Sequence, residues 1–205
     1  MSDTCSPEIS ERDLIAAAQH DPQAFERLYQ LFLPRVYSYV SYRVGQAEST
    51  EELVSDVFLK GAQALPTFEW RHPGSFGAWL FRIAHNVVLN HLRSADRHTK
   101  WQAPVSLDDL AELHSTAPSP EEVALRQEQN DTLRRLLLSL PQRRQEIITL
   151  RFFGELHNHE IASVLDLDER TVASHLCRGL RDLHALWLAE LARLNSLEQV
   201  EHKDG

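Results

Sequence analysis

The chain has little of what builds β-sheets, disulfide scaffolds or metal centres. Its 205 residues include only 7 glycines and 2 cysteines, and few segments alternate β-branched with polar residues. We therefore expect helices throughout and an all-α fold. Cys5 and Cys177 stand far apart in different contexts, which argues against a disulfide and fits a reducing cytoplasm.

Long apolar runs are also missing. No stretch of about 18 apolar residues is present that could form a membrane-spanning helix, and the N-terminus lacks the basic flank and apolar core of a signal peptide. We expect a cytoplasmic protein without membrane insertion.

No catalytic triad, metal-ligand set or phosphate-binding glycine loop is present, so we expect no enzyme activity, cofactor or metal. His157 and His159 are two residues apart and point to different sides of a helix.

Charge is distributed unevenly. The formal net charge of -9 argues against nucleic-acid binding by itself. Residues 71–100, however, carry five Lys and Arg against one acid, whereas residues 101–132 carry one Arg against seven acids. This pattern predicts a protein that contacts DNA locally and meets a larger partner elsewhere.

The composition divides the chain into two small helical domains joined by an acidic linker. Residues 1–9 are expected to be a disordered N-terminus. The first domain spans residues 10–96, the proline-containing linker spans residues 97–128 and the second domain spans residues 129–187. The remaining residues, 188–205, form a C-terminal tail, and its first part could prolong the last helix.

The first domain contains a helix with an acidic face. Ser49 and Glu52 have the spacing of a capping box, which predicts a helix from about Thr50 to Leu65. Such a face is either simply solvated or docks a protein partner. Its exposed candidates are Glu52, Ser55, Asp56 and Leu59.

A second helix, expected from about Phe76 to Ala95, has a polar row without any acid. The row is spaced by four, four and three residues, which places it on one helical face. Guanidinium groups can contact phosphates and amides can contact base edges, so we interpret the face as a nucleic-acid contact. Its members are Arg82, Asn86, Asn90 and Arg93.

The stretch 140–187 has the pattern of a helix-turn-helix. A helix begins at Leu140-Pro141, Gly154 interrupts it, and a short helix ends near Leu165. After a tight connection a longer helix begins near Arg170. This arrangement places a recognition helix in a DNA major groove, although an ordinary three-helix packing unit would show the same periodicity.

Residues 52–65, 75–93 and 140–183 together resemble bacterial RNA polymerase sigma factors of the extracytoplasmic-function (ECF) type in the sigma-70 family. The resemblance implies a first domain that binds the polymerase clamp and the promoter −10 element. It implies a second, helix-turn-helix domain that binds the −35 element and the polymerase flap. An anti-sigma factor is a further implied partner.

The resemblance also implies roles for individual residues. Glu52, Ser55, Asp56 and Leu59 would dock on core polymerase. Asn86 would help to capture a flipped −10 base in a pocket shaped by the loop Thr67–Ser75. The −35 element would be read by Arg170, Thr171, Ser174, His175 and Arg178.

The recognition helix departs from the family pattern. Ala173 and His175 stand where relatives commonly carry Lys and Arg, Arg170 replaces a small residue, and Cys177 stands where histidine is common. Fewer cations predict weaker phosphate contacts. The resemblance therefore does not define the −35 sequence that is read.

Two other functions are consistent with the same sequence. A stand-alone helix-turn-helix regulator predicts a dimer and leaves the segments 52–65 and 75–93 without a role. A helical adaptor with no DNA role predicts that the polar row beginning at Arg82 is dispensable.

Overall fold

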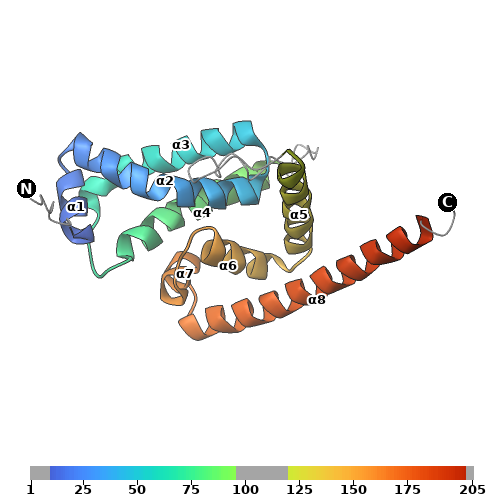
Figure 1. Cartoon of the computed structure of the whole chain (residues 1–205). Coiled ribbons are helices and arrows are strands. Elements are labelled where there is room, and N and C mark those ends of the chain that lie inside the picture. The colour runs from blue at the N-terminus through green and yellow to red at the C-terminus, as the bar shows by residue number, and fades with distance from the viewer. Residues whose placement is uncertain (1–9, 96–119, 202–205) are drawn as a thin grey trace, which may run out of the picture.

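A computed structural model describes residues 10–95 and 120–201, and the regular structure within these ranges is helical, with no strand. The expected all-α fold is confirmed. The first region (residues 10–95) contains α1 (Glu11–Ala18), α2 (Pro22–Val44), α3 (Ala47–Ala64), a 3-10 turn (Leu65–Thr67) and α4 (Ser75–Ala95). The second region (residues 120–201) contains α5 (Pro120–Leu138), α6 (Gln142–Phe152), α7 (Asn158–Leu165) and α8 (Glu169–Glu201) (Figure 1).

The ends of α2 follow from local sequence. The Asp21 side chain accepts a hydrogen bond from the Gln23 N–H at 2.9 Å, and Pro22 occupies the first turn, where its missing N–H is not needed. The helix continues past Pro34 and ends at Gly45. Gly45 adopts the left-handed conformation (φ +83°) that closes many helices and favours glycine.

The predicted start of α3 is wrong. The helix begins at Ala47 with Gln46 as its N-cap, so Ser49 lies inside the first turn and does not cap it. The Ser49 hydroxyl donates to Oε1 of Gln46 at 3.3 Å, and the Thr50 hydroxyl donates to the Gln46 carbonyl at 2.7 Å. The reason is tertiary: Gly45 turns the chain back so that α3 packs against α2, and the short turn fixes where α3 begins.

The second region forms the expected helix-turn-helix. Pro141 precedes α6, and the chain leaves α6 through Phe153 and Gly154. The short α7 ends at Asp166, whose left-handed backbone (φ 54°) turns the chain into α8. The last helix runs to Glu201 and does not stop near Trp187, so the first part of the expected tail prolongs it.

The linker lies mostly outside the described residues. Of the stretch 97–128, the structure describes only the part from Pro120 onward, and that part is already helical in α5. Residues 120–128 of the expected linker are thus part of α5.

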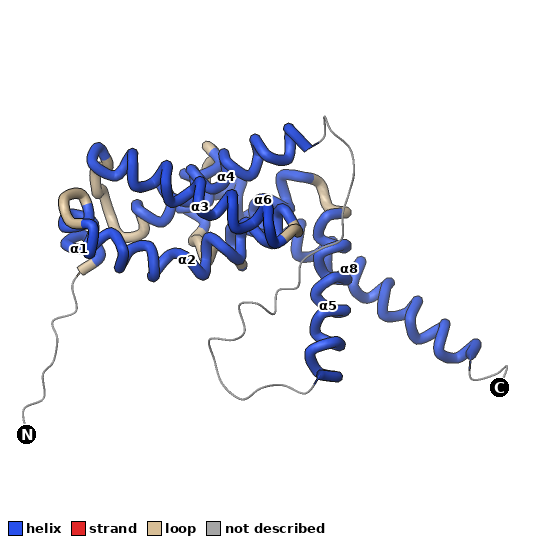
Figure 2. The backbone as a smooth tube through the Cα atoms, turned by 90° about the horizontal axis from the view of Figure 1, so that it is seen from above, coloured by secondary structure: helices blue, strands red, loops and turns tan. Residues whose placement is uncertain are grey.

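The two regions share one hydrophobic core. Buried residues of α2 and α4, among them Phe81 with no exposed surface, belong to the same cluster as Leu156 and Ile161 of the second region. Tyr42 of α2 also stacks on Phe153, with ring centroids 4.1 Å apart. Figures 1 and 2 show the first region lying against α6 and α7, while the C-terminal part of α8 extends away from the body.

Candidate nucleic-acid interface

The polar row of α4 lies on the surface, as its spacing predicts. Arg82, Asn86, Asn90 and Arg93 are exposed. The opposite side of the helix buries Phe76 and Leu80, among others, in the core. A rigid helix therefore presents two amides between two guanidinium groups, a set that can contact phosphates and base edges together.

One end of this row touches the second region. The Arg82 guanidinium donates a hydrogen bond to the backbone carbonyl of Ser163 in α7. Asn86 and Asn90, which follow along the helix, are exposed. In this conformation the second region thus occupies one end of the surface expected to meet DNA.

A cavity of about 470 Å³ lies beside that contact. The loop predicted to shape a base pocket forms one wall, from Thr67 to Ser75, and α4 contributes Ala78, Trp79 and Arg82. The remaining wall comes from α7, through His159, Glu160 and Ser163. Phe68 and Trp79 face each other with ring centroids 5.0 Å apart. The structure therefore brings the loop and α4 together, and it adds a wall from the second region that the sequence did not indicate.

The acidic face of α3 is also where the sequence places it. Glu52, Ser55 and Leu59 are exposed and Asp56 is half-buried. Leu59 keeps 57% of its surface accessible. Asp56 pairs with Lys60 at 2.6 Å, with both side chains about half exposed, so the pair contributes little to stability. An exposed leucine among acids suits a partner that offers apolar and basic groups.

The helix-turn-helix presents its candidate residues unequally. Arg170 and Arg178 are exposed, whereas Ser174 and His175 are half-buried. Thr171 is engaged by the start of its own helix: its hydroxyl donates to the Asp168 carboxylate at 2.6 Å and its N–H donates at 2.8 Å. These hydrogen bonds hold the pKa of Asp168 below its usual value.

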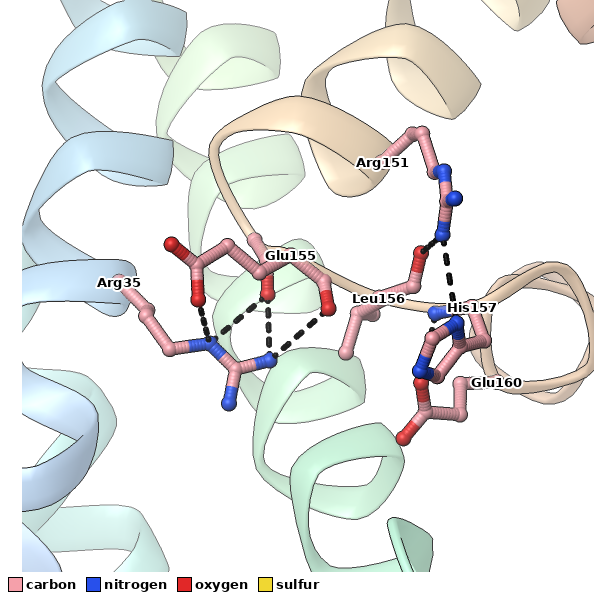
Figure 3. A network of polar contacts seen from close by, with 7 residues as sticks. Arg35, Arg151, Glu155, Leu156, His157 and Glu160 are labelled. Atoms are coloured by element: carbon pink, nitrogen blue, oxygen red, sulfur yellow. Dashed lines mark hydrogen bonds and ion pairs between the residues drawn. The ribbon is translucent and has the colours of Figure 1, made fainter.

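Several residues at or near the contact between the two regions were not identified from the sequence. Arg35 of α2 donates to the carbonyl of Gly154 and lies 3.5 Å from the Glu155 carboxylate (Figure 3). In α7, Glu160 accepts the His157 N–H at 2.6 Å. An arginine inside the apolar pattern of α2 was the available signal, but its partner lies 119 residues away.

Among the described residues, no group of three or more His, Cys, Asp or Glu side chains could hold a metal ion. Within the same residues, no helix is long and apolar enough to cross a membrane.

The described residues form a two-region helical protein that presents an acid-free polar row on α4 and an acidic face on α3. Comparison with known families specifies the class. Sigma-70 region 2 matches residues 28–98 and sigma-70 region 4 matches residues 130–183. The chain belongs to the ECF sigma factors of the sigma-70 family.

The sequence similarity to known sigma factors extends over most of the chain. It is 32% identical over 175 residues to the ECF RNA polymerase sigma factor BldN of Streptomyces coelicolor, covering 85% of this chain and 64% of that protein. It is 30% identical to the RNA polymerase sigma factor YlaC of Bacillus subtilis, covering 78% of this chain and 90% of YlaC. It is also 30% identical to the ECF RNA polymerase sigma-E factor of Escherichia coli K12, covering 85% of this chain and 92% of that protein.

Solved structures share the fold. CnrH, solved in complex with the cytosolic domain of CnrY, superimposes with a TM-score of 0.62 at 24% identity, covering 87% of this chain and 97% of CnrH. The sigma factor RpoE of Bartonella quintana, solved with the anti-sigma factor NepR, gives a TM-score of 0.60 at 20% identity, covering 80% of this chain and 97% of RpoE.

Proposed function

We propose that this sigma factor binds core RNA polymerase and directs it to promoters through two DNA contacts. The α4 row and the adjoining cavity serve the −10 element, and the helix-turn-helix serves the −35 element. The observation that carries the proposal is the exposed row on α4 beside a cavity bordered by the loop 67–75, within the part that matches sigma-70 region 2. This role places the chain in the cytoplasm.

The polymerase-facing surface is the acidic face of α3. Glu52 and Asp56 supply charge, Ser55 supplies a hydroxyl group and Leu59 supplies apolar area. Exposed apolar residues within a polar surface are typical of docking sites. The second region contacts the polymerase flap in the same assembly.

At the −10 element the chain captures an extruded base. Flipping a base costs a few kcal/mol of lost stacking and pairing. Stacking against an aromatic side chain of the cavity offsets that cost. Asn86 lies on α4 one turn beyond Arg82 and is not part of the cavity lining, so its amide adds hydrogen bonds to the DNA strand outside the cavity. In the described arrangement α7 forms one wall of the cavity beside Phe68 and Trp79, so separation of the two regions would open this space to a DNA strand. No covalent chemistry is required, and we infer that the isolated chain is not an enzyme.

Promoter binding requires the two regions to separate. The −10 and −35 elements are about 25 base pairs apart, or about 85 Å along B-DNA. In the structure α4 packs against α7, the first helix of the helix-turn-helix. One rigid body with these two helices in contact cannot reach both elements. We infer that the described arrangement is a closed state and that polymerase binds the opened chain.

An anti-sigma factor stabilises the closed state in this proposal. Bartonella quintana RpoE, whose structure shares this fold, was solved with such a partner. A protein that contacts both regions of the closed chain would prevent their separation and thereby block polymerase.

The test is in vitro transcription with core polymerase across a promoter library. Transcription that starts only when the chain is added, with selected sequences at two positions spaced as above, supports the proposal. A chain that does not associate with core polymerase but binds a palindromic operator as a dimer would support a stand-alone regulator. The matches in both regions and to whole sigma factors do not favour that alternative.

A further inference from the structure

The N-terminal helix α1 and its C-cap residue, Gln19, contact the loop between α3 and α4 through three side chains. The match to sigma-70 region 2 begins at residue 28, so α1, which ends at Ala18, lies outside it. Figure 1 shows α1 beside the loop that precedes α4. The loop is the one that borders the cavity described above, so these contacts bear on its shape.

Gln19 holds the first end of the loop. Its side-chain Nε2 donates to the Phe68 carbonyl at 2.7 Å and to the Leu65 carbonyl at 3.2 Å. Leu65 begins the 3-10 turn and Phe68 directly follows it, so the two acceptors flank this turn. Gln19 is half-buried, so water competes only partly for these bonds. The site needs a donor, because two carbonyl oxygens face the amide.

Glu11 holds the other end of the loop. Its Oε2 accepts a hydrogen bond from the Gly74 N–H at 3.1 Å. Gly74 has a left-handed backbone (φ +80°), and a Cβ there would lie 2.2 Å from Oε1 of Glu160. The turn into α4 is therefore restricted to glycine and fixed by an acceptor from α1.

The spacing of the two contacts matches the helix. Glu11 and Gln19 are eight residues apart, which is about 12 Å along a helix and within about 80° on its surface. Between them, the Arg12 guanidinium lies 5.4 Å from the ring centroid of Trp70, in the middle of the loop. A cation over an indole ring is a favourable contact. One face of α1 thus contacts the beginning, middle and end of the loop.

We propose that α1 is the positioning element of the base-capture loop, with Gln19 and Glu11 as its positioning residues. They hold the loop in its base-accepting shape before DNA arrives, so that less conformational freedom is lost on capture. Phe68 is positioned most directly, because Gln19 donates to its carbonyl and its ring borders the cavity. This inference rests on the proposed function, in which the loop captures a −10 base.

The first test replaces Gln19 by Glu. The change keeps size and shape but places a carboxylate against two carbonyl oxygens. Holoenzyme would be assembled with core polymerase and a promoter selected by the wild-type chain. Open-complex formation would be measured on that promoter and on versions with a single abasic site at each −10 position of the non-template strand. Gln30→Glu is the matched control, because Gln30 is exposed on α2 and its amide donates to Glu26 of the same helix.

The wild type and Q30E should lose open complexes when the captured base is abasic. Q19E should form open complexes about tenfold more slowly on intact DNA, as expected for the loss of two hydrogen bonds, and should be nearly insensitive to the same abasic site. Equal sensitivity of Q19E and wild type to that site would overturn the inference. A wild type that is indifferent to every abasic site would instead overturn base capture itself.

Uncharged and conservative variants separate positioning from folding. Gln19→Met keeps the packing without a new charge and should show the same reduced sensitivity as Q19E. Glu11→Gln keeps an acceptor for the Gly74 N–H and should behave as wild type, whereas Glu11→Leu should behave as Q19E. Core-polymerase affinity should be unchanged in all of them, since α3 presents its docking face elsewhere. If E11Q and E11L behave alike, the Gly74 contact does not position the loop.

Discussion

The guanidinium of Arg35 and the carbonyl of Gly154 join the two regions of this sigma factor. Nη2 of Arg35 donates to the carbonyl at 2.6 Å and Nε donates at 3.1 Å. The same guanidinium lies over the rings of Phe32 and Phe81, at 5.2 and 5.6 Å from their centroids. Burial lowers the pKa of Arg35, and the paired bonds to one carbonyl offset that desolvation. In this arrangement Arg35 of the first region is thus partnered by backbone carbonyls of the second region.

Arg35→Met should loosen the closed state. Methionine keeps much of the apolar packing but leaves the Gly154 carbonyl without its donor, which costs about 1–3 kcal/mol. We expect a lower free energy of unfolding, a longer mean distance between fluorophores on the two regions, and faster association with core polymerase. Chemical denaturation, energy transfer and stopped-flow mixing measure the three quantities.

Arg27→Met is the control for this change, because Arg27 is exposed on the same helix. It should leave all three measurements unchanged. An R35M chain with an unaltered inter-region distance would show that the shared apolar core alone holds the regions together.

His85 should make stability depend on pH. Burial lowers its pKa to about 4, and its Nδ1 lies 3.1 Å from the Tyr39 hydroxyl. The nearby Glu146 carboxylate raises the pKa of His85, whereas the Arg43 guanidinium lowers it. The unfolded chain takes up the proton near pH 6.5, whereas the folded chain does so only near pH 4. Stability should therefore fall as pH falls through this window, by up to about 3 kcal/mol.

Urea unfolding at pH 7.0 and pH 5.0 measures this slope. His85→Gln keeps a partner for Tyr39 and should flatten it, whereas His20→Gln changes an exposed residue and should not. Asp168 and Glu190 have lowered pKa values, so they affect the pH dependence of stability at lower pH than His85 does. A slope retained in H85Q would assign the pH dependence to other groups.

Leu59→Asp should weaken polymerase binding without weakening the fold. Leu59 is 57% exposed on the α3 face. We expect at least a roughly tenfold loss of affinity for core polymerase, because a charged side chain would replace the apolar residue of the docking surface. The free energy of unfolding should change by no more than about 0.5 kcal/mol. Fluorescence anisotropy with labelled chain reports the affinity.

Leu31→Asp is matched to this variant, since Leu31 is equally exposed, at 57%, but lies on α2. It should retain wild-type affinity. Equal losses in the two variants would mean that the docking surface is broader than the α3 face.

Asn86→Ala should impair −10 melting more than −35 binding. The side chain is exposed on α4, so its removal leaves the core intact. Permanganate reactivity of −10 thymines should fall several-fold, while footprinting of the −35 element by holoenzyme stays unchanged. Gln30→Ala provides an exposed amide outside α4. Parallel losses at both elements would assign Asn86 a structural role.

The local patterns that the sequence predicts correctly are periodic ones. The α4 row from Arg82 to Arg93 is exposed because its spacing fixes one side of a helix, whatever packs on the other. The turn at Asp166 follows for a similar reason, since the apolar pattern changes phase there. The start of α3 was missed because Gly45 and the packing against α2 decide it.

What the sequence determined by itself is the family, the helices and the faces that each helix offers. Tertiary structure alone decided how those faces are used. It places Ser163 on Arg82 and Gly154 on Arg35, and it sets Gln19 of α1 against the loop at Phe68. These pairs are between 49 and 119 residues apart. Periodicity reports neighbours within a few turns of one helix, whereas a hydrogen bond across such separations exists only after the helices have packed.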